Sequence, residues 1–102
     1  MSYVVVARYL ARPGERDRVL DLLEPVVTAS RAEPGCRRYD VHTGVEDDVV
    51  VLVEEYHGAA DFTRHCETEH FQRIVLGQVV PLLADRQVTR CVPVDAGRGA
   101  EA

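Results

Sequence analysis

Two stretches, "YVVVARYLA" at residues 3–11 and "VVVLVEEY" at residues 49–56, decide the fold of this chain. Both are rich in β-branched and aromatic residues and stay apolar at successive positions. A strand with one exposed face alternates apolar and polar residues, whereas a strand covered on both faces does not need to. We therefore predict that these two stretches are the central strands of one sheet.

Two segments between the predicted strands have apolar residues at helical spacing. Residues 14–32 end at an acid-Pro-Gly turn, which predicts one helix that Pro25 kinks or weakens. After Gly58 the pattern predicts a helix in two parts, the first over about 59–67. Thr68 is expected to cap the second part, with Glu69 near its positive end.

The remaining two strands are predicted at the edges of the sheet. Residues 36–44 alternate less regularly, and residues 86–94 contain Pro93, which suits an edge or a strand end. The order strand, helix, strand, strand, helix, strand predicts an α+β, ferredoxin-like βαββαβ fold with an antiparallel four-stranded sheet. Helices cover only one face of such a sheet, so a second copy of the chain, in a homodimer, is expected to cover the other.

Length and composition limit the class of protein. The 102 residues predict one domain over residues 1–94 and a disordered tail over residues 95–102. A net charge of −5 and scattered arginines argue against nucleic acid as a partner, and no apolar run is long enough for a membrane span. The start lacks a signal-peptide pattern and the cysteines are odd in number, so we expect a cytoplasmic protein with reduced thiols.

The stretch "HCETEHF", residues 65–71, concentrates groups that could serve a metal, a turn or proton chemistry. His65 and His70 are five residues apart and would point about 140° away from each other on a continuous helix, so we predict no metal site. Glu67 and Glu69 are expected to be solvated or to complement the helix end. The two histidines are either hydrogen-bonded structural groups or catalysts.

The stretches "VEEYHGAADFTRHCETEHFQRI" (53–74) and "ASRAEPGCRRYDVH" (29–42) resemble the antibiotic biosynthesis monooxygenase family. The resemblance implies a dimeric α+β barrel with a pocket between sheet and helices in each subunit. It also implies that a phenol, anthrone or quinol is oxidised by molecular oxygen without flavin, haem or metal. The chain has no tryptophan and no asparagine, which disfavours the haem-degrading branch of the family.

For an oxygenase of this kind, the site needs a base that deprotonates the aromatic substrate, and histidine titrates in the right range. We expect His65 to be the base, and His70 to be the alternative base or a hydrogen-bond donor to a peroxide. No cofactor is expected. The residues expected to bind the substrate are Tyr39, Tyr56, Phe62, Phe71 and, as an anion-stabilising group, Arg8.

Two other functions fit the same fold. The chain could be an isomerase, a cyclase-like enzyme or a small-ligand-binding protein, because fold does not determine chemistry. It could also be a structural dimer whose pocket is filled by its own side chains. Each of the aromatic residues named above is more commonly found as an ordinary core residue than as a substrate contact, because small domains bury Phe and Tyr regardless of function.

Overall fold

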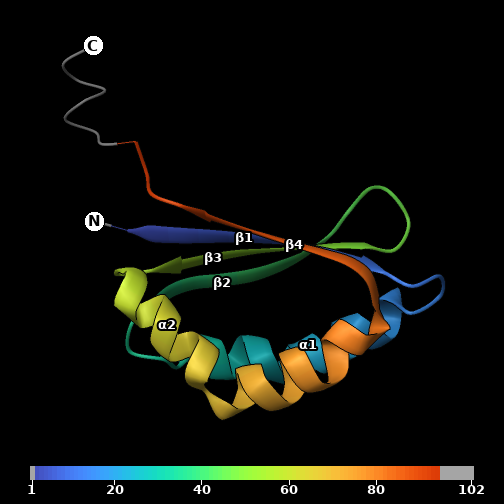
Figure 1. Ribbon diagram of the computed structural model, residues 1–102, viewed down its shortest axis with the longest axis horizontal. Coiled ribbons are helices and arrows are strands. Elements are labelled where there is room, and N and C mark those ends of the chain that lie inside the picture. Colours follow the sequence, from blue (N-terminus) through green and yellow to red (C-terminus); the bar gives the residue numbers. More distant parts are fainter. Residues whose placement is uncertain (1, 95–102) are drawn as a thin grey trace.

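The computed structural model describes residues 2–94, so the predicted tail over 95–102 lies outside the described residues. Its sheet has the strand order β2-β3-β1-β4 with every neighbouring pair antiparallel, which confirms the ferredoxin-like α+β fold. All the helices lie on one face of the sheet (Figure 1). The elements are β1 (Tyr3–Ala11), α1 (Arg16–Arg31), β2 (Cys36–Thr43), β3 (Val49–Tyr56), α2 (Ala59–Glu67), the π-helix η1 (His70–Val79), the 3-10 turn η2 (Val80–Leu82) and β4 (Leu83–Cys91).

The predicted central strands are the two middle strands of the sheet. Ala7 of β1 pairs with Leu52 of β3 on one side and with Val88 of β4 on the other. Alternate residues of β1 are buried beneath the helices, among them Val5 and Tyr9. One face of β1 packs on the helices. The other, which is apolar except for Arg8, forms the centre of the sheet's second face.

The core lies between the sheet and the helices. Val19, Leu23 and Val26 recur on one face of α1 and are fully buried. They pack with Val50 and Leu52 of β3, as the helical spacing predicts. Within residues 2–94, no helix combines the length and apolarity needed to cross a membrane.

Helix α1 runs through Pro25 without interruption, as a single element of 16 residues. The carbonyl that loses its hydrogen-bond donor belongs to Asp21, and Asp21 and Pro25 both lie on the exposed side of the helix. Water can therefore donate the hydrogen bond that this carbonyl lacks, and the loss of one helical hydrogen bond does not interrupt α1.

The last strand begins three residues earlier than predicted. It runs from Leu83 to Cys91, so Pro93 lies beyond it. Leu83 pairs with Ala11 after a register shift and is buried, and the apolar run before it gives no local sign that the helix has ended. The predicted bounds of this strand, residues 86–94, were wrong. The strand begins where Leu83 pairs with another strand, and the local sequence pattern does not reveal that pairing.

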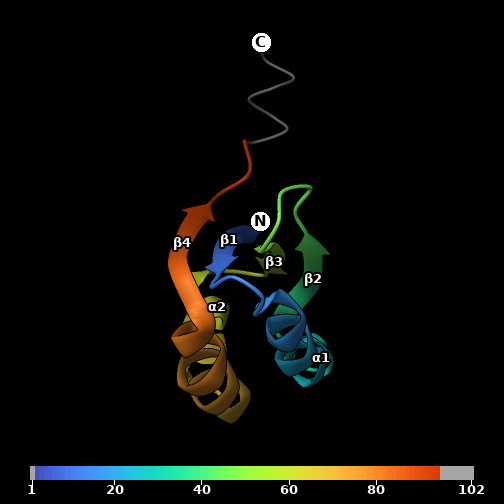
Figure 2. The same ribbon diagram turned by 90° about the vertical axis from the view of Figure 1, so that its right-hand side faces the viewer.

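The second face of the sheet has no helix over it. Viewed from the end of the sheet, α1 and α2 lie together on one side (Figure 2). The register places Val4, Val6 and Leu10 of β1 on the opposite, open face, together with Val51 and Val53 of β3. These side chains are half-buried in the single chain.

We predict that Val50→Ala lowers the free energy of unfolding by about 2 kcal/mol, because it removes buried methyl groups and leaves a void. The matched control is Val45→Ala, since Val45 is 107% exposed whereas Val50 is 0% exposed. Urea denaturation of both variants measures the difference. Equal loss of stability in the two would contradict this description of the core.

Candidate active site

His65 lies at the centre of a cluster between α2 and the sheet. Its side chain is 1% exposed. Nδ1 lies 2.8 Å from Oε2 of Glu33, which precedes β2, and Nε2 lies 3.8 Å from Oε1 of Glu54 on β3. The imidazole therefore lies between two carboxyl groups, each contributed by a different segment.

Glu33 also contacts the second histidine. Its Oε2 lies 2.6 Å from Nε2 of His70, so one carboxylate oxygen accepts hydrogen bonds from both imidazoles. This arrangement is possible because the helix breaks at Thr68, whose backbone is extended at φ −68° and ψ 154°. The expectation that His65 and His70 point apart was wrong, because it assumed a continuous helix.

Thr68 stabilises the break with its hydroxyl group. The hydroxyl donates to the carbonyl oxygen of His65 at 2.7 Å and accepts from the backbone N–H of Phe71 at 3.3 Å. The predicted capping role is confirmed. Glu69 forms an exposed ion pair with Arg73 at 2.8 Å, which agrees with the expectation that this acid is solvated.

Glu54 is an acid on the buried face of a central strand. It is 4% exposed, and its Oε1 accepts a hydrogen bond from the hydroxyl of Tyr56 at 2.6 Å. Burial raises the pKa of Glu54 to about 7, although the Tyr56 hydrogen bond and the Arg86 charge act in the opposite direction. Near neutral pH, Glu54 is therefore a carboxyl group able both to hold and to release a proton.

The environment also fixes the protonation of His65. Burial lowers the pKa of His65, although the hydrogen bond to Glu33 favours the charged form. A neutral imidazole whose Nδ1–H donates to Glu33 has its lone pair on Nε2, facing Glu54. Burial raises the pKa of both Tyr39 and Tyr56, so these phenols stay protonated.

Aromatic rings surround the His65 ring. The structure thus brings together both predicted histidines and four of the predicted substrate-binding residues. Ring centroids lie 5.5 Å away for Tyr39, 5.4 Å for Tyr56, 6.1 Å for Phe62, 5.3 Å for Phe71 and 5.9 Å for His70.

Arg8 is not part of this cluster. It pairs with Val51 and Gln87 on the open face, between neighbours in β1 whose side chains point toward the helices. The sheet therefore separates Arg8 from the imidazoles, and it cannot stabilise an anion beside them.

Two hollows adjoin the outer part of the cluster. The His70 hollow, about 440 Å³, is lined by Glu69, His70, Arg73, Ile74 and Gln78. The Glu33 hollow, about 400 Å³, is lined by Glu33, Pro34, Gly35, Asp61, Arg64, Glu67 and Thr68. Because His65 lines neither of them, Glu33 and His70 are the members of the cluster that an incoming molecule meets.

Gly35 lies in the turn between Glu33 and β2, and its backbone packs closely against α2. A Cβ atom at this position would overlap the carboxylate of Asp61. The backbone carbonyl of Gly35 also accepts a hydrogen bond from the N–H of His57 at 3.0 Å. The turn that carries Glu33 is thus held directly against the helix that carries His65.

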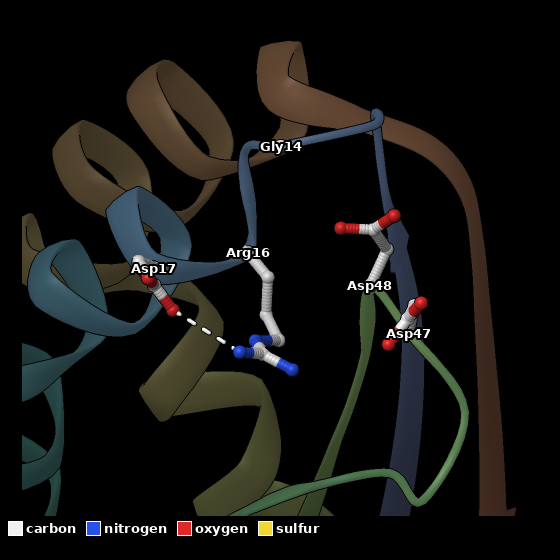
Figure 3. A pocket seen from close by; sticks show the side chains of 5 residues that line it. All are labelled: Gly14, Arg16, Asp17, Asp47 and Asp48. Carbon is white, nitrogen blue, oxygen red and sulfur yellow. Dashed lines mark hydrogen bonds and ion pairs between the residues drawn. The ribbon is translucent and has the colours of Figure 1, made fainter.

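A third hollow, about 280 Å³, lies at the opposite end of the sheet (Figure 3). The Arg16 side chain extends between Asp17 on one side and Asp47 and Asp48 on the other. Its guanidinium pairs with Asp17 at 3.4 Å. This hollow is lined by neither a histidine nor an aromatic ring.

Among the described residues, Glu33, His65 and His70 could hold a metal ion, since their three donor atoms lie within 4.8 Å of one another. Two imidazoles and a carboxylate suit a divalent transition metal. Without a metal, the same three atoms form two hydrogen bonds, from the two imidazoles to the carboxylate of Glu33. The absence of a metal from the functional protein stays a prediction.

Sequence reasoning did not select Glu33 or Glu54 as site residues. Glu54 had a usable signal, because it occupies the inward position in the alternation that Val50 and Leu52 define. Glu33 had no local signal beyond its place in the acid-Pro-Gly turn. Burial raises the pKa of Cys66, and raises that of Cys36 to about 11, so neither thiol is an activated nucleophile.

The chain is similar to two curated proteins that are named as monooxygenases. It is 32% identical over 93 residues to "Putative monooxygenase Rv0793" of Mycobacterium tuberculosis, covering 89% of this chain and 90% of the relative. It is 34% identical over 74 residues to "Putative monooxygenase YcnE" of Bacillus subtilis, covering 71% and 78%.

Solved structures agree with these sequence relationships. The structure of Rv0793 from Mycobacterium tuberculosis superposes with a TM-score of 0.86 at 32% identity, covering 93% of this chain and 97% of that one. PA3566 from Pseudomonas aeruginosa gives a TM-score of 0.84 at 29% identity, with 92% and 95% covered. Residues 2–75 match the family model described as antibiotic biosynthesis monooxygenase, and this chain belongs to that family.

Proposed function

We propose that the chain oxidises a phenolic or quinol-type aromatic substrate with molecular oxygen, without an organic cofactor or a metal. The observation that supports this most is the Glu33–His70 pair, an imidazole hydrogen-bonded to a carboxylate beside a hollow. A phenol or quinol becomes a good one-electron reductant only after deprotonation. The pair supplies the base that this step needs.

His70 is the better candidate for the base that meets the substrate. The sequence favoured His65, but both nitrogens of His65 face carboxyl groups and its side chain is 1% exposed. The His70 side chain is 18% exposed. Because its Nε2–H donates to Glu33, its Nδ1 carries the lone pair that accepts a proton.

Other residues of the His70 hollow suit an aromatic anion. Ile74 gives it an apolar wall. Arg73 pairs with Glu69 at 2.8 Å in the same hollow and stabilises a phenolate when its guanidinium turns from that acid to the substrate. Phe71, next to His70 in the chain, packs against the His65 ring.

The proposed reaction conserves atoms and electrons. His70 takes the phenolic proton, and the phenolate passes one electron to oxygen, giving an aryloxyl radical and superoxide. These recombine into a carbon–oxygen bond, and His70 returns its proton to the peroxide anion that results. The hydroperoxide then loses water to leave a quinone. One oxygen atom enters the product and the other leaves in water.

We also propose that the functional unit is a homodimer in which the open faces of two sheets meet. Val4, Val6, Leu10, Val51 and Val53 form an apolar surface that no element of residues 2–94 covers. Burial of such a surface stabilises association, and two copies related by a two-fold axis supply the same surface to each other.

An isomerase remains the alternative, because a histidine oriented by a carboxylate also catalyses proton transfer between carbon atoms. The mass of the product separates the two reactions. An isomerase leaves the mass of its substrate unchanged, whereas the proposed oxygenase replaces two hydrogen atoms with one oxygen atom.

We predict that His70→Ala lowers kcat for oxygen consumption with an anthrone or simple quinol by about 100-fold or more, because the general base is lost. The matched control is His57→Ala, which removes an exposed histidine and should leave kcat unchanged. An oxygen electrode with mass analysis of the product gives both readouts. Wild-type protein that consumes no oxygen, or a product of unchanged mass, would contradict the proposed function.

We predict that dialysis against a chelator leaves kcat unchanged, because no proposed step passes through a metal ion. Elemental analysis of the dialysed protein should accompany the oxygen measurement. Loss of activity that returns with a single added divalent metal would refute the metal-free reaction.

We predict a homodimer in solution that Val6→Arg dissociates, because the substitution buries an unpaired charge in the proposed interface. The expected loss is about 3 kcal/mol or more, roughly 100-fold in Kd. Val45→Arg, at an exposed loop position, is the control and should remain dimeric. Light scattering after gel filtration measures the mass, and a monomeric wild type would rule out the dimer.

A further inference from the structure

We propose that Glu54 is the proton store of this site, and that His65 and Glu33 carry its proton to the side of the cluster that His70 exposes. The inference rests on the proposed function and extends it to residues that do not touch the substrate. Glu54 then stores a proton and His65 passes it on, and neither residue touches the substrate. Only the Glu33–His70 pair meets the reacting molecule.

The contacts form a continuous chain from the sheet to the hollow. The Tyr56 hydroxyl holds Glu54 at 2.6 Å, and Glu54 faces Nε2 of His65. Nδ1 of His65 contacts Glu33 at 2.8 Å, and the same oxygen of Glu33 contacts His70 at 2.6 Å. An imidazole can accept a proton on one nitrogen and release another from its second nitrogen, so His65 can transmit a proton without rotating.

One link in this chain is open in the structure. The 3.8 Å between Nε2 of His65 and Oε1 of Glu54 is too long for a hydrogen bond. A small side-chain rotation that shortens this distance by about 1 Å would complete the chain. Transfer from Glu54 is therefore conditional on side-chain motion, whereas the contacts of Glu33 are already made.

The groups around Glu54 allow a proton to reside there. The charged groups that act on it are Glu33, which favours the protonated form, and Arg86 of β4, which favours the ionised form. His65 faces it from α2. The remaining titratable neighbours are phenols and thiols, namely Tyr9, Tyr39, Tyr56, Cys36 and Cys66.

The last step of the proposed reaction explains why a stored proton is useful. Collapse of the peroxide breaks its O–O bond, removes a proton from carbon and releases hydroxide, which must be protonated. The site then needs a base and an acid at once, and His70 alone can supply only one of them. A proton from Glu54 supplies the acid.

The transfer balances in both directions. Glu54 gives its proton to Nε2 of His65, the Nδ1 proton of His65 moves to Glu33, and Glu33 protonates the leaving hydroxide. His70 meanwhile takes the proton from carbon. Afterwards His70 passes its Nε2 proton through Glu33 to Nδ1 of His65, and the Nε2 proton of His65 returns to Glu54. Exchange with solvent then restores the His70 tautomer. The net result is one proton moved from the substrate carbon to the departing water.

The kinetic test compares Glu54→Gln with Glu55→Gln. Glutamine keeps the shape of Glu54 and an oxygen that accepts from Tyr56, but it cannot release a proton near neutral pH. Glu55 is the adjacent acid on the open face and serves as the matched control. We expect Glu54→Gln to lower kcat by about 10- to 100-fold with KM unchanged.

The pH profile separates proton storage from a structural role. In the wild type, kcat should fall as the pH rises through about 7, because Glu54 must hold its proton to supply it. Glu54→Gln should lack this step, whereas Glu55→Gln should retain it. A Glu54→Gln enzyme with the wild-type kcat and the wild-type pH profile would overturn the relay.

A second measurement does not depend on turnover. Long-range proton–nitrogen NMR of the four histidines reports which ring nitrogen carries a proton. We expect His65 to show the Nδ1–H form and to respond to a titration step that disappears in Glu54→Gln. If the wild type consumes no oxygen, the proposed function fails but this test still decides the relay. If the His65 signal titrates in the same way in the wild type and in Glu54→Gln, the proposed relay is wrong.

Discussion

One carboxylate oxygen, Oε2 of Glu33, connects the parts of the chain that make the site. It contacts imidazoles that lie 32 and 37 residues further along the sequence. Because hydrogen bonds to a charged group are among the stronger polar contacts, this oxygen fixes both α2 and the start of η1 relative to the turn before β2. Without it, the buried His65 ring and the half-buried His70 ring would lose the acceptor that they share.

The fold could be predicted because its determinants are local. Apolar residues at successive positions identify central strands, and the 3.6-residue period identifies α1, since in both cases burial follows from the element's own geometry. The start of β4 could not be found in this way. Leu83 joins the strand by pairing with Ala11, a partner 72 residues earlier that no local pattern reveals.

The site was only partly predictable, for a related reason. The histidines and aromatic rings stand out by residue type, and the structure gathers them around His65. Their carboxyl partners do not stand out, because acids are common on protein surfaces and only the tertiary structure makes Glu54 a buried one. The direction of His70 relative to His65 depends on the backbone at Thr68, and the position of Arg8 depends on which face of β1 the helices cover.

The tight contact at Gly35 has a consequence for how sequences of this kind can diverge. Any side chain at position 35 would displace Asp61 and, with it, the first turn of α2. That displacement would separate Glu33 from the imidazoles although position 35 itself carries no chemistry. The Cβ of Asp61 would itself lie 2.6 Å from a Cβ at position 35, so a descendant with a side chain there has to acquire glycine at position 61 or move α2. The two positions should therefore covary.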